Sequence, residues 1–148
     1  LFQDRDEERY IEALSLAMQT SYENGLYQFA YMQYHMLFMT AIYFVLLKLY
    51  TLHHDEMEQA LYYLLKDRYN DFSGKENTKD EQLYFGSFAA IGESDVFKLL
   101  HIVGMDSNLE GELKKLVKER NAYAHANGRL LLTSEEFFLE KIRNFNGF

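Results

Sequence analysis

Proline is absent from all 148 residues of this chain, and its absence constrains the fold more than any other feature. Proline interrupts a helix because it lacks the backbone N–H that the helix uses, so no segment here is barred from being helical. Between the glycines, apolar residues recur three and four positions apart and do not alternate as they do in strands. The sequence therefore predicts an all-α fold, arranged as a helical bundle.

The helix boundaries follow from this spacing and from the residues that interrupt it. A helix over residues 4–22 begins with acidic residues, which suit the positive end of the helix dipole, and stops at Asn24 and Gly25. A central helix over residues 26–50 is apolar in most directions. Further on we predict a helix over residues 55–69 with Asp55 as its N-cap, a mobile loop over residues 73–80, and a short helix over residues 93–103 that ends near Gly104. Residues 82–91 stay ambiguous.

The chain is long enough for one domain over residues 1–148, and its 48% hydrophobic residues supply a sizeable core. It has no cysteine, which excludes disulfides, thiolate metal sites and cysteine nucleophiles, and which fits a reducing compartment. It shows no secretory leader, and its start at Leu1 suggests an origin in a longer chain. We therefore expect a cytoplasmic location.

The most membrane-like stretch covers residues 36–47. It is about a dozen residues long, well short of the roughly 20 that cross a bilayer. We interpret it as part of a core helix and expect no membrane partner. A membrane hairpin or a segment lying on the membrane surface stays open as the alternative, because the apolar residues surround this helix.

The formal net charge of −8 lowers the expectation of nucleic-acid binding, since phosphate contacts draw on lysine and arginine. The acidic residues gather in two places, residues 4–8 and 76–81. A locally basic surface elsewhere therefore remains compatible with the acidic total.

A helix over residues 107–128 has the clearest boundaries in the chain. Ser107 and Glu110 have the spacing of a capping box, and Gly128 suits a left-handed stop. On a helical wheel one face of this helix is apolar, and it carries Leu113, Leu116, Val117 and Ala124. That face is expected to pack against protein.

Arg120 falls in the middle of this apolar face, where a guanidinium needs an anionic partner. A polar, locally basic strip runs along the edge of the face and consists of Lys114, Lys118, Asn121 and His125. Phosphate is a plausible anion for such a strip. In the plainer interpretation the lysines are solvated, Arg120 pairs with a buried carboxylate, and His125 ends the helix favourably.

The segment Arg120-Asn121-Ala122-Tyr123-Ala124-His125 resembles the Arg-Asn-x-x-x-His signature of the HEPN superfamily. The resemblance implies a HEPN-like bundle of two long helices with shorter ones, and a two-fold homodimer. It also implies a metal-independent endoribonuclease of the toxin–antitoxin, phage-defence or RNA-processing kind. An antitoxin or a larger effector protein is then a possible partner. HEPN toxins that a nucleotidyltransferase silences carry a tyrosine two residues after the histidine, where this chain has Asn127. Tyr123 lies on the apolar side, so it is expected in a core or an interface.

The chemistry of RNA cleavage suits these residue types. Attack by the 2′-OH needs a group that moves protons near neutral pH and a positively charged group that binds the phosphate. The reaction leaves a 2′,3′-cyclic phosphate. We assign His125 as general acid/base, Arg120 as phosphate clamp and Asn121 as orienter, with Lys114 and Lys118 binding the RNA backbone. No metal or cofactor is required, and a dimer would supply a second histidine. The alternatives are a non-catalytic HEPN-like module that binds a nucleotide, RNA or a protein, and a purely structural bundle.

Other candidate sites are weaker. His53 to Glu56 contains two adjacent histidines, which point about 100° apart on a helix and suit an interhelical turn better than a metal site. His35 and His101 are isolated and are expected to be packing residues. The aromatic residues between 22 and 50 have the spacing of a core rather than of a base-stacking surface. No serine hydrolase arrangement or phosphate-binding glycine loop is present in the sequence.

Overall fold

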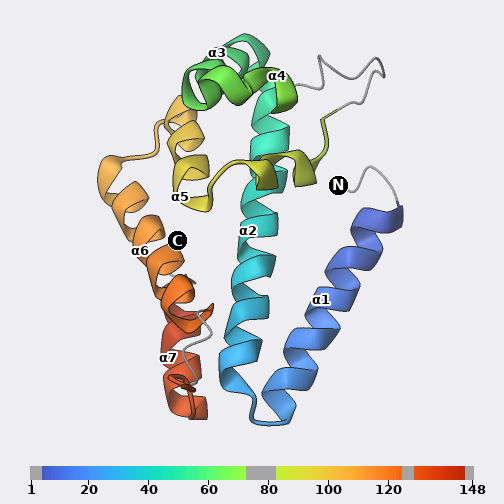
Figure 1. Ribbon diagram of the computed structural model, residues 1–148, viewed down its shortest axis with the longest axis vertical. Coiled ribbons are helices and arrows are strands. Elements are labelled where there is room, and N and C mark those ends of the chain that lie inside the picture. Colours follow the sequence, from blue (N-terminus) through green and yellow to red (C-terminus); the bar gives the residue numbers. More distant parts are fainter. Residues whose placement is uncertain (1–4, 73–82, 125–128, 146–148) are drawn as a thin grey trace. The chain divides into compact units, whose positions relative to one another are not determined.

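The computed structural model describes residues 5–72, 83–124 and 129–145, and its regular elements within these ranges are all helical (Figure 1). This confirms the prediction of an all-α fold. In chain order the elements are α1 (Arg5–Glu23), α2 (Tyr27–Leu52), α3 (His54–Leu65), η1 (Lys66–Arg68), α4 (Tyr69–Phe72), η2 (Phe85–Ala90), α5 (Glu93–Val96), η3 (Phe97–Val103), α6 (Ser107–Ala124) and α7 (Glu135–Phe145).

The chain forms two compact units. Unit 1 comprises residues 1–39 and 115–148, and unit 2 comprises residues 40–114. The long helices α2 and α6 each contribute residues to both units. The single domain over residues 1–148 stays a prediction.

In unit 1, α1 and the first part of α2 run antiparallel on either side of the turn at Gly25 (Figure 1). Gly25 has a φ of 70°, a left-handed conformation that glycine adopts without strain, so the predicted helix stop is confirmed. The buried side chains come from all four helices of the unit, among them Leu14, Tyr31, Val117 and Phe145. The ring of Phe145 lies 5.0–5.9 Å from the rings of Phe38, Tyr34, Tyr31 and His35. His35 is thus a packing residue, as expected.

In unit 2 the predicted helix over residues 55–69 is interrupted. It begins one residue earlier, at His54, and ends at Leu65, because Lys66 has a φ of 50° and starts a short 3₁₀ turn before α4. His53, not Asp55, is the N-cap residue, so the predicted capping role of Asp55 is wrong. The predicted loop over residues 73–80 lies outside the described residues.

A half-buried carboxylate, that of Glu58, links α2, α3 and α4 within unit 2. Glu58 of α3 accepts a hydrogen bond from the Tyr50 hydroxyl of α2, at 2.6 Å, and another from the Tyr69 hydroxyl of α4. Burial and these bonds raise the pKa of Tyr50, and they raise the pKa of Tyr69 to about 12. The 3₁₀ helix η3 ends at Val103, and the φ of 82° at Gly104 confirms the predicted stop after residue 103.

The last helix, α7, was not predicted. Its first turn is capped by Ser134, whose Oγ accepts the Phe137 N–H at 3.3 Å. Acidic residues follow in the first turn, Arg143 lies in the last turn, and Phe138 and Phe145 are buried. The capping serine and the dipole-matched charges are ordinary helix signals, and they were available in the sequence.

Helix α2 passes a length and composition test for crossing a membrane, and it is the only described helix that does. It has 26 residues, and its most apolar 18-residue window has a mean hydropathy of 1.5 with 33% of it buried. The bounds of α2 agree with the central helix predicted over residues 26–50. The core helix of a soluble protein has the same length and composition.

Candidate functional site

The start of α6 differs from the prediction. Asp106 caps the helix, because its Oδ1 accepts the backbone N–H groups of Asn108 and Leu109, the latter at 3.1 Å. Ser107 is the first residue of the helix, and Glu110 faces other partners. The predicted Ser107–Glu110 capping box is therefore wrong.

Glu110 instead binds two side chains within unit 2, a lysine and a histidine. Its carboxylate pairs with Lys114 one turn later and with His101 Nε2 at 2.7 Å. Bonds from Lys114 and then from His101 lower the pKa of Glu110. His101 is exposed and lies within hydrogen-bond distance of Glu110, so the expectation that it packs is wrong. The proposed contact of Lys114 with RNA stays a prediction, and phosphate would compete there with Glu110.

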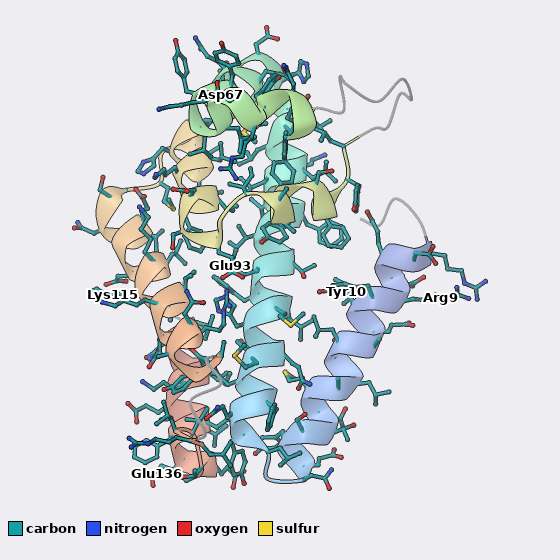
Figure 2. All side chains as sticks on the ribbon, in the orientation of Figure 1. Arg9, Tyr10, Asp67, Glu93, Lys115 and Glu136 are labelled. Atoms are coloured by element: carbon teal, nitrogen blue, oxygen red, sulfur yellow. The ribbon has the colours of Figure 1, made fainter. Side chains whose placement is uncertain are left out.

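The part of α6 that belongs to unit 1 carries the remaining described motif residues. Leu116 and Val117 are buried, as the apolar face predicted. Arg120 is half-buried, whereas Lys118 and Asn121 are exposed. Lys115, labelled in Figure 2, points outward from the same part of the helix and adds positive charge. His125, Asn127 and Gly128 lie outside the described residues.

Glu119, which precedes Arg120 in α6, forms a polar cluster with Lys141 and Tyr123. The Glu119 carboxylate pairs with Lys141 of α7 and accepts a hydrogen bond from the Tyr123 hydroxyl at 3.4 Å. The Tyr123 ring packs edge-on against Tyr31 of α2, with centroids 5.2 Å apart. Tyr123 is thus half-buried in unit 1, in agreement with the core role expected for it.

Two opposite charges act on Tyr31. Burial and the Glu119 carboxylate raise the pKa of Tyr31, whereas the positive charge of Arg120 acts to lower it. The guanidinium of Arg120 is therefore close enough to influence this phenol.

Gln28 of α2 is a residue near the motif that the sequence did not reveal. Its side chain is only 8% exposed, and its Nε2 donates to the carbonyl oxygen of Tyr123 at 3.0 Å. Its Oε1 accepts the backbone N–H groups of Leu131 at 2.7 Å and Leu132 at 3.4 Å. A glutamine in a largely apolar helix was the available signal, since a buried amide needs partners.

The described residues contain no group of three or more histidine, aspartate or glutamate side chains that could hold a metal ion. Of the two adjacent histidines, His53 is the N-cap of α3 and His54 its first residue. The His54 ring packs edge-on against the Tyr50 ring, with centroids 4.8 Å apart.

No protein-family model, curated protein or solved structure matches this chain. The resemblance to HEPN domains therefore depends on the motif from Arg120 to His125 and on the helical class. What this site does is accordingly a proposal, argued from its own residues.

Proposed function

We propose that this protein is a metal-independent endoribonuclease of the HEPN type. The observation that carries the proposal is the arrangement at the end of α6, where Arg120 is half-buried beside exposed Asn121. Burial of part of an arginine holds the guanidinium in place, and the exposed neighbours leave room for an anionic ligand. A phosphodiester of RNA fits this combination of charge and hydrogen-bonding groups.

Each residue has a distinct role in the proposed reaction. His125 moves protons during attack of the 2′-OH, because imidazole titrates near neutral pH. Arg120 holds the phosphate as negative charge builds on its oxygens, and Asn121 orients the ribose or the imidazole. Lys118, and Lys114 when it leaves Glu110, would bind the neighbouring backbone phosphates. The phosphorus–O5′ bond breaks, the 5′-oxygen takes a proton, and a 2′,3′-cyclic phosphate remains.

We further propose that two copies of the chain form the working enzyme, since one histidine would otherwise serve as both base and acid. Unit 1 exposes apolar side chains that such a contact would cover, with Phe29 52% and Leu130 61% exposed. Both residues line a cavity of about 120 Å³ in this unit.

A role as a cytoplasmic toxin or defence effector, restrained by an antitoxin or by a larger effector protein, would follow from the same family resemblance.

The test is cleavage of tRNA, mRNA and rRNA by the purified chain in EDTA. The variants His125→Ala and Arg120→Ala are expected to abolish cleavage, with losses of at least ~100-fold. Matched controls are His54→Ala, an exposed histidine of unit 2, and Arg143→Ala, an exposed arginine of α7. Both controls should cleave like the wild type.

The outcomes separate the candidate functions. Cleavage lost in the two motif variants and kept in the controls supports the nuclease. RNA binding that weakens with salt, without any cleavage, would instead favour a non-catalytic binding module. Neither binding nor cleavage would leave a structural bundle.

A further inference from the structure

Unit 1 contains a second, larger cavity, of about 410 Å³, that has no role in the proposed nuclease. Its walls come from α1, α2 and α7, and all of its lining residues belong to this unit. Neither Arg120 nor Asn121 lines it. Sites for small molecules usually have volumes of about 300–1,000 Å³, so this cavity is large enough for a small organic ligand.

The wall of the cavity is mostly apolar and aromatic. Tyr22, Tyr34 and Phe138 line it together with Met18. The rings of Tyr22 and Phe138 pack with centroids 5.2 Å apart, and burial raises the pKa of Tyr34, whose phenol is partly shielded from water. Aromatic rings and methionine sulfur both pack favourably against a further aromatic ring. The cavity therefore suits a ligand with an aromatic body.

The extent of the lining sets the length of that ligand. On α1 the lining residues extend from Ser15 to Tyr22, which is about 10 Å at 1.5 Å per residue. On α7 they extend from Phe138 to Ile142, which is about 6 Å. One fused two-ring aromatic with a short side chain fits these lengths.

Two polar residues of the lining donate hydrogen bonds to carboxylates. The Tyr22 hydroxyl donates to Glu135 of α7, and Gln19 Nε2 donates to Glu23 at 2.8 Å. A carboxylate has about four acceptor positions, so each can also accept a bond from a ligand. The C-terminal end of α1 adds partial negative charge, and its last turn contains no basic residue. The polar groups next to this cavity therefore favour a ligand that carries a positive charge.

We propose that this cavity binds a small aromatic amine, with its ring among the aromatic side chains of the wall and its ammonium group on Glu135. Glu135 is exposed, and the hydrogen bond from Tyr22 keeps its carboxylate next to the lining. An ammonium group has three N–H donors and can bind this carboxylate while Tyr22 keeps its own bond. The proposal does not depend on the nuclease, because the two sites have no residue in common.

The first test compares ligands of different charge. The chain has no tryptophan, so indole fluorescence reports on an added indole without a background from the protein. Three indoles of similar size are used with the purified chain: tryptamine is cationic, tryptophol is neutral and indoleacetate is anionic. Because the ion pair is exposed to solvent, we expect tryptamine to bind ~3-fold more tightly than tryptophol and ~10-fold more tightly than indoleacetate. Absence of tryptamine binding, or equal binding of all three, would overturn the proposal.

The second test removes the charge of Glu135. Glu135→Gln keeps an oxygen that can accept the Tyr22 hydroxyl, so the wall of the cavity is preserved. We expect the affinity for tryptamine to fall ~3-fold and the affinity for tryptophol to stay the same. The matched control is Glu136→Gln, which changes the neighbouring exposed glutamate and should bind tryptamine like the wild type. An equal loss in both variants would overturn the pairing with Glu135, since the overall charge of the chain would explain it.

The third test locates the ligand with a larger side chain in the cavity wall. Ser15→Phe is expected to weaken tryptamine binding at least ~10-fold, because its ring occupies space that the ligand needs. The matched control is Leu16→Phe, since Leu16 is the next residue of α1 and is 66% exposed. It should bind tryptamine like the wild type. Unchanged binding in a folded Ser15→Phe variant would overturn this cavity as the site. If Ser15→Phe does not fold, Glu135→Gln still decides the proposal, because it changes an exposed residue.

Discussion

The hydrogen bond between Tyr69 and Glu58 leads to a quantitative prediction for the free energy of unfolding at alkaline pH. In the folded chain the Tyr69 hydroxyl donates to the Glu58 carboxylate, and the pKa of Tyr69 rises from 10.0 to about 12. A difference of about two pKa units between the folded and unfolded chains corresponds to ~2.7 kcal/mol. Burial is the largest cause of this rise in pKa, and the hydrogen bond to Glu58 is the second. A hydrogen bond to a charged group contributes about 1.5–3 kcal/mol to stability.

We expect Tyr69→Phe to lower the free energy of unfolding by about 2 kcal/mol at pH 8. The sign of the pH dependence follows from the raised pKa: the contribution of Tyr69 is complete below pH 10 and is lost as the pH rises toward 12. About half of it should be gone by pH 11, because the unfolded chain is by then largely deprotonated at this residue. The difference in stability between wild type and variant should therefore shrink between pH 9 and pH 11.

The assay is urea unfolding followed by circular dichroism at pH 8, 9, 10 and 11. Tyr63→Phe is the matched control, since Tyr63 lies on the same helix α3 and is 68% exposed. Its stability should match the wild type within about 0.5 kcal/mol. The reasoning is refuted if Tyr69→Phe is as stable as the wild type at pH 8, or if the difference between them stays constant up to pH 11.

Two further predictions concern the ends and the packing of the helices. Asp106→Ala should destabilise the chain by ~1 kcal/mol, because the Asp106 carboxylate accepts hydrogen bonds from the first backbone amides of α6. Ser107→Ala should change the stability by only about 0.3 kcal/mol. Equal effects of the two substitutions in thermal unfolding would contradict the assignment of Asp106 as the N-cap. Phe138→Ala should cost about 3–5 kcal/mol, because the ring is 6% exposed and packs on Tyr22, whereas Phe137→Ala at 56% exposure should cost less than ~0.5 kcal/mol. Urea unfolding measures both, and a similar loss in the two phenylalanine variants would show that α7 does not pack as described.

Features that depend on a residue and its near neighbours were predictable from the sequence. The absence of proline and the three- and four-residue spacing predicted helices, and Gly25 and Gly104 end them in left-handed conformations. The apolar face of α6, with Arg120 in it, also follows from spacing alone, because the helical period fixes which residues share a face. The nuclease roles of Arg120, Asn121 and His125 go beyond this and stay a proposal.

Local sequence patterns did not identify the N-cap of α6, because two neighbouring residues are both suited to that position. Asp106 and Ser107 are both good N-cap residues, and only the path of the chain before α6 decides that Asp106 caps it. Lys66 interrupts a helix in which nothing in the spacing marks a break. Helix α7 has local signals in the sequence, since Ser134 caps it and Arg143 lies in its last turn.

Tertiary structure alone decided which distant polar groups meet near the candidate site. Gln28 and Tyr123 are 95 residues apart, and Glu119 pairs with Lys141 of a helix that the sequence reading had missed. A glutamine or a lysine can bind many partners, so its type and spacing do not identify one. The choice is made by burial, which removes water from these groups and leaves only the partners that the folded chain brings within reach.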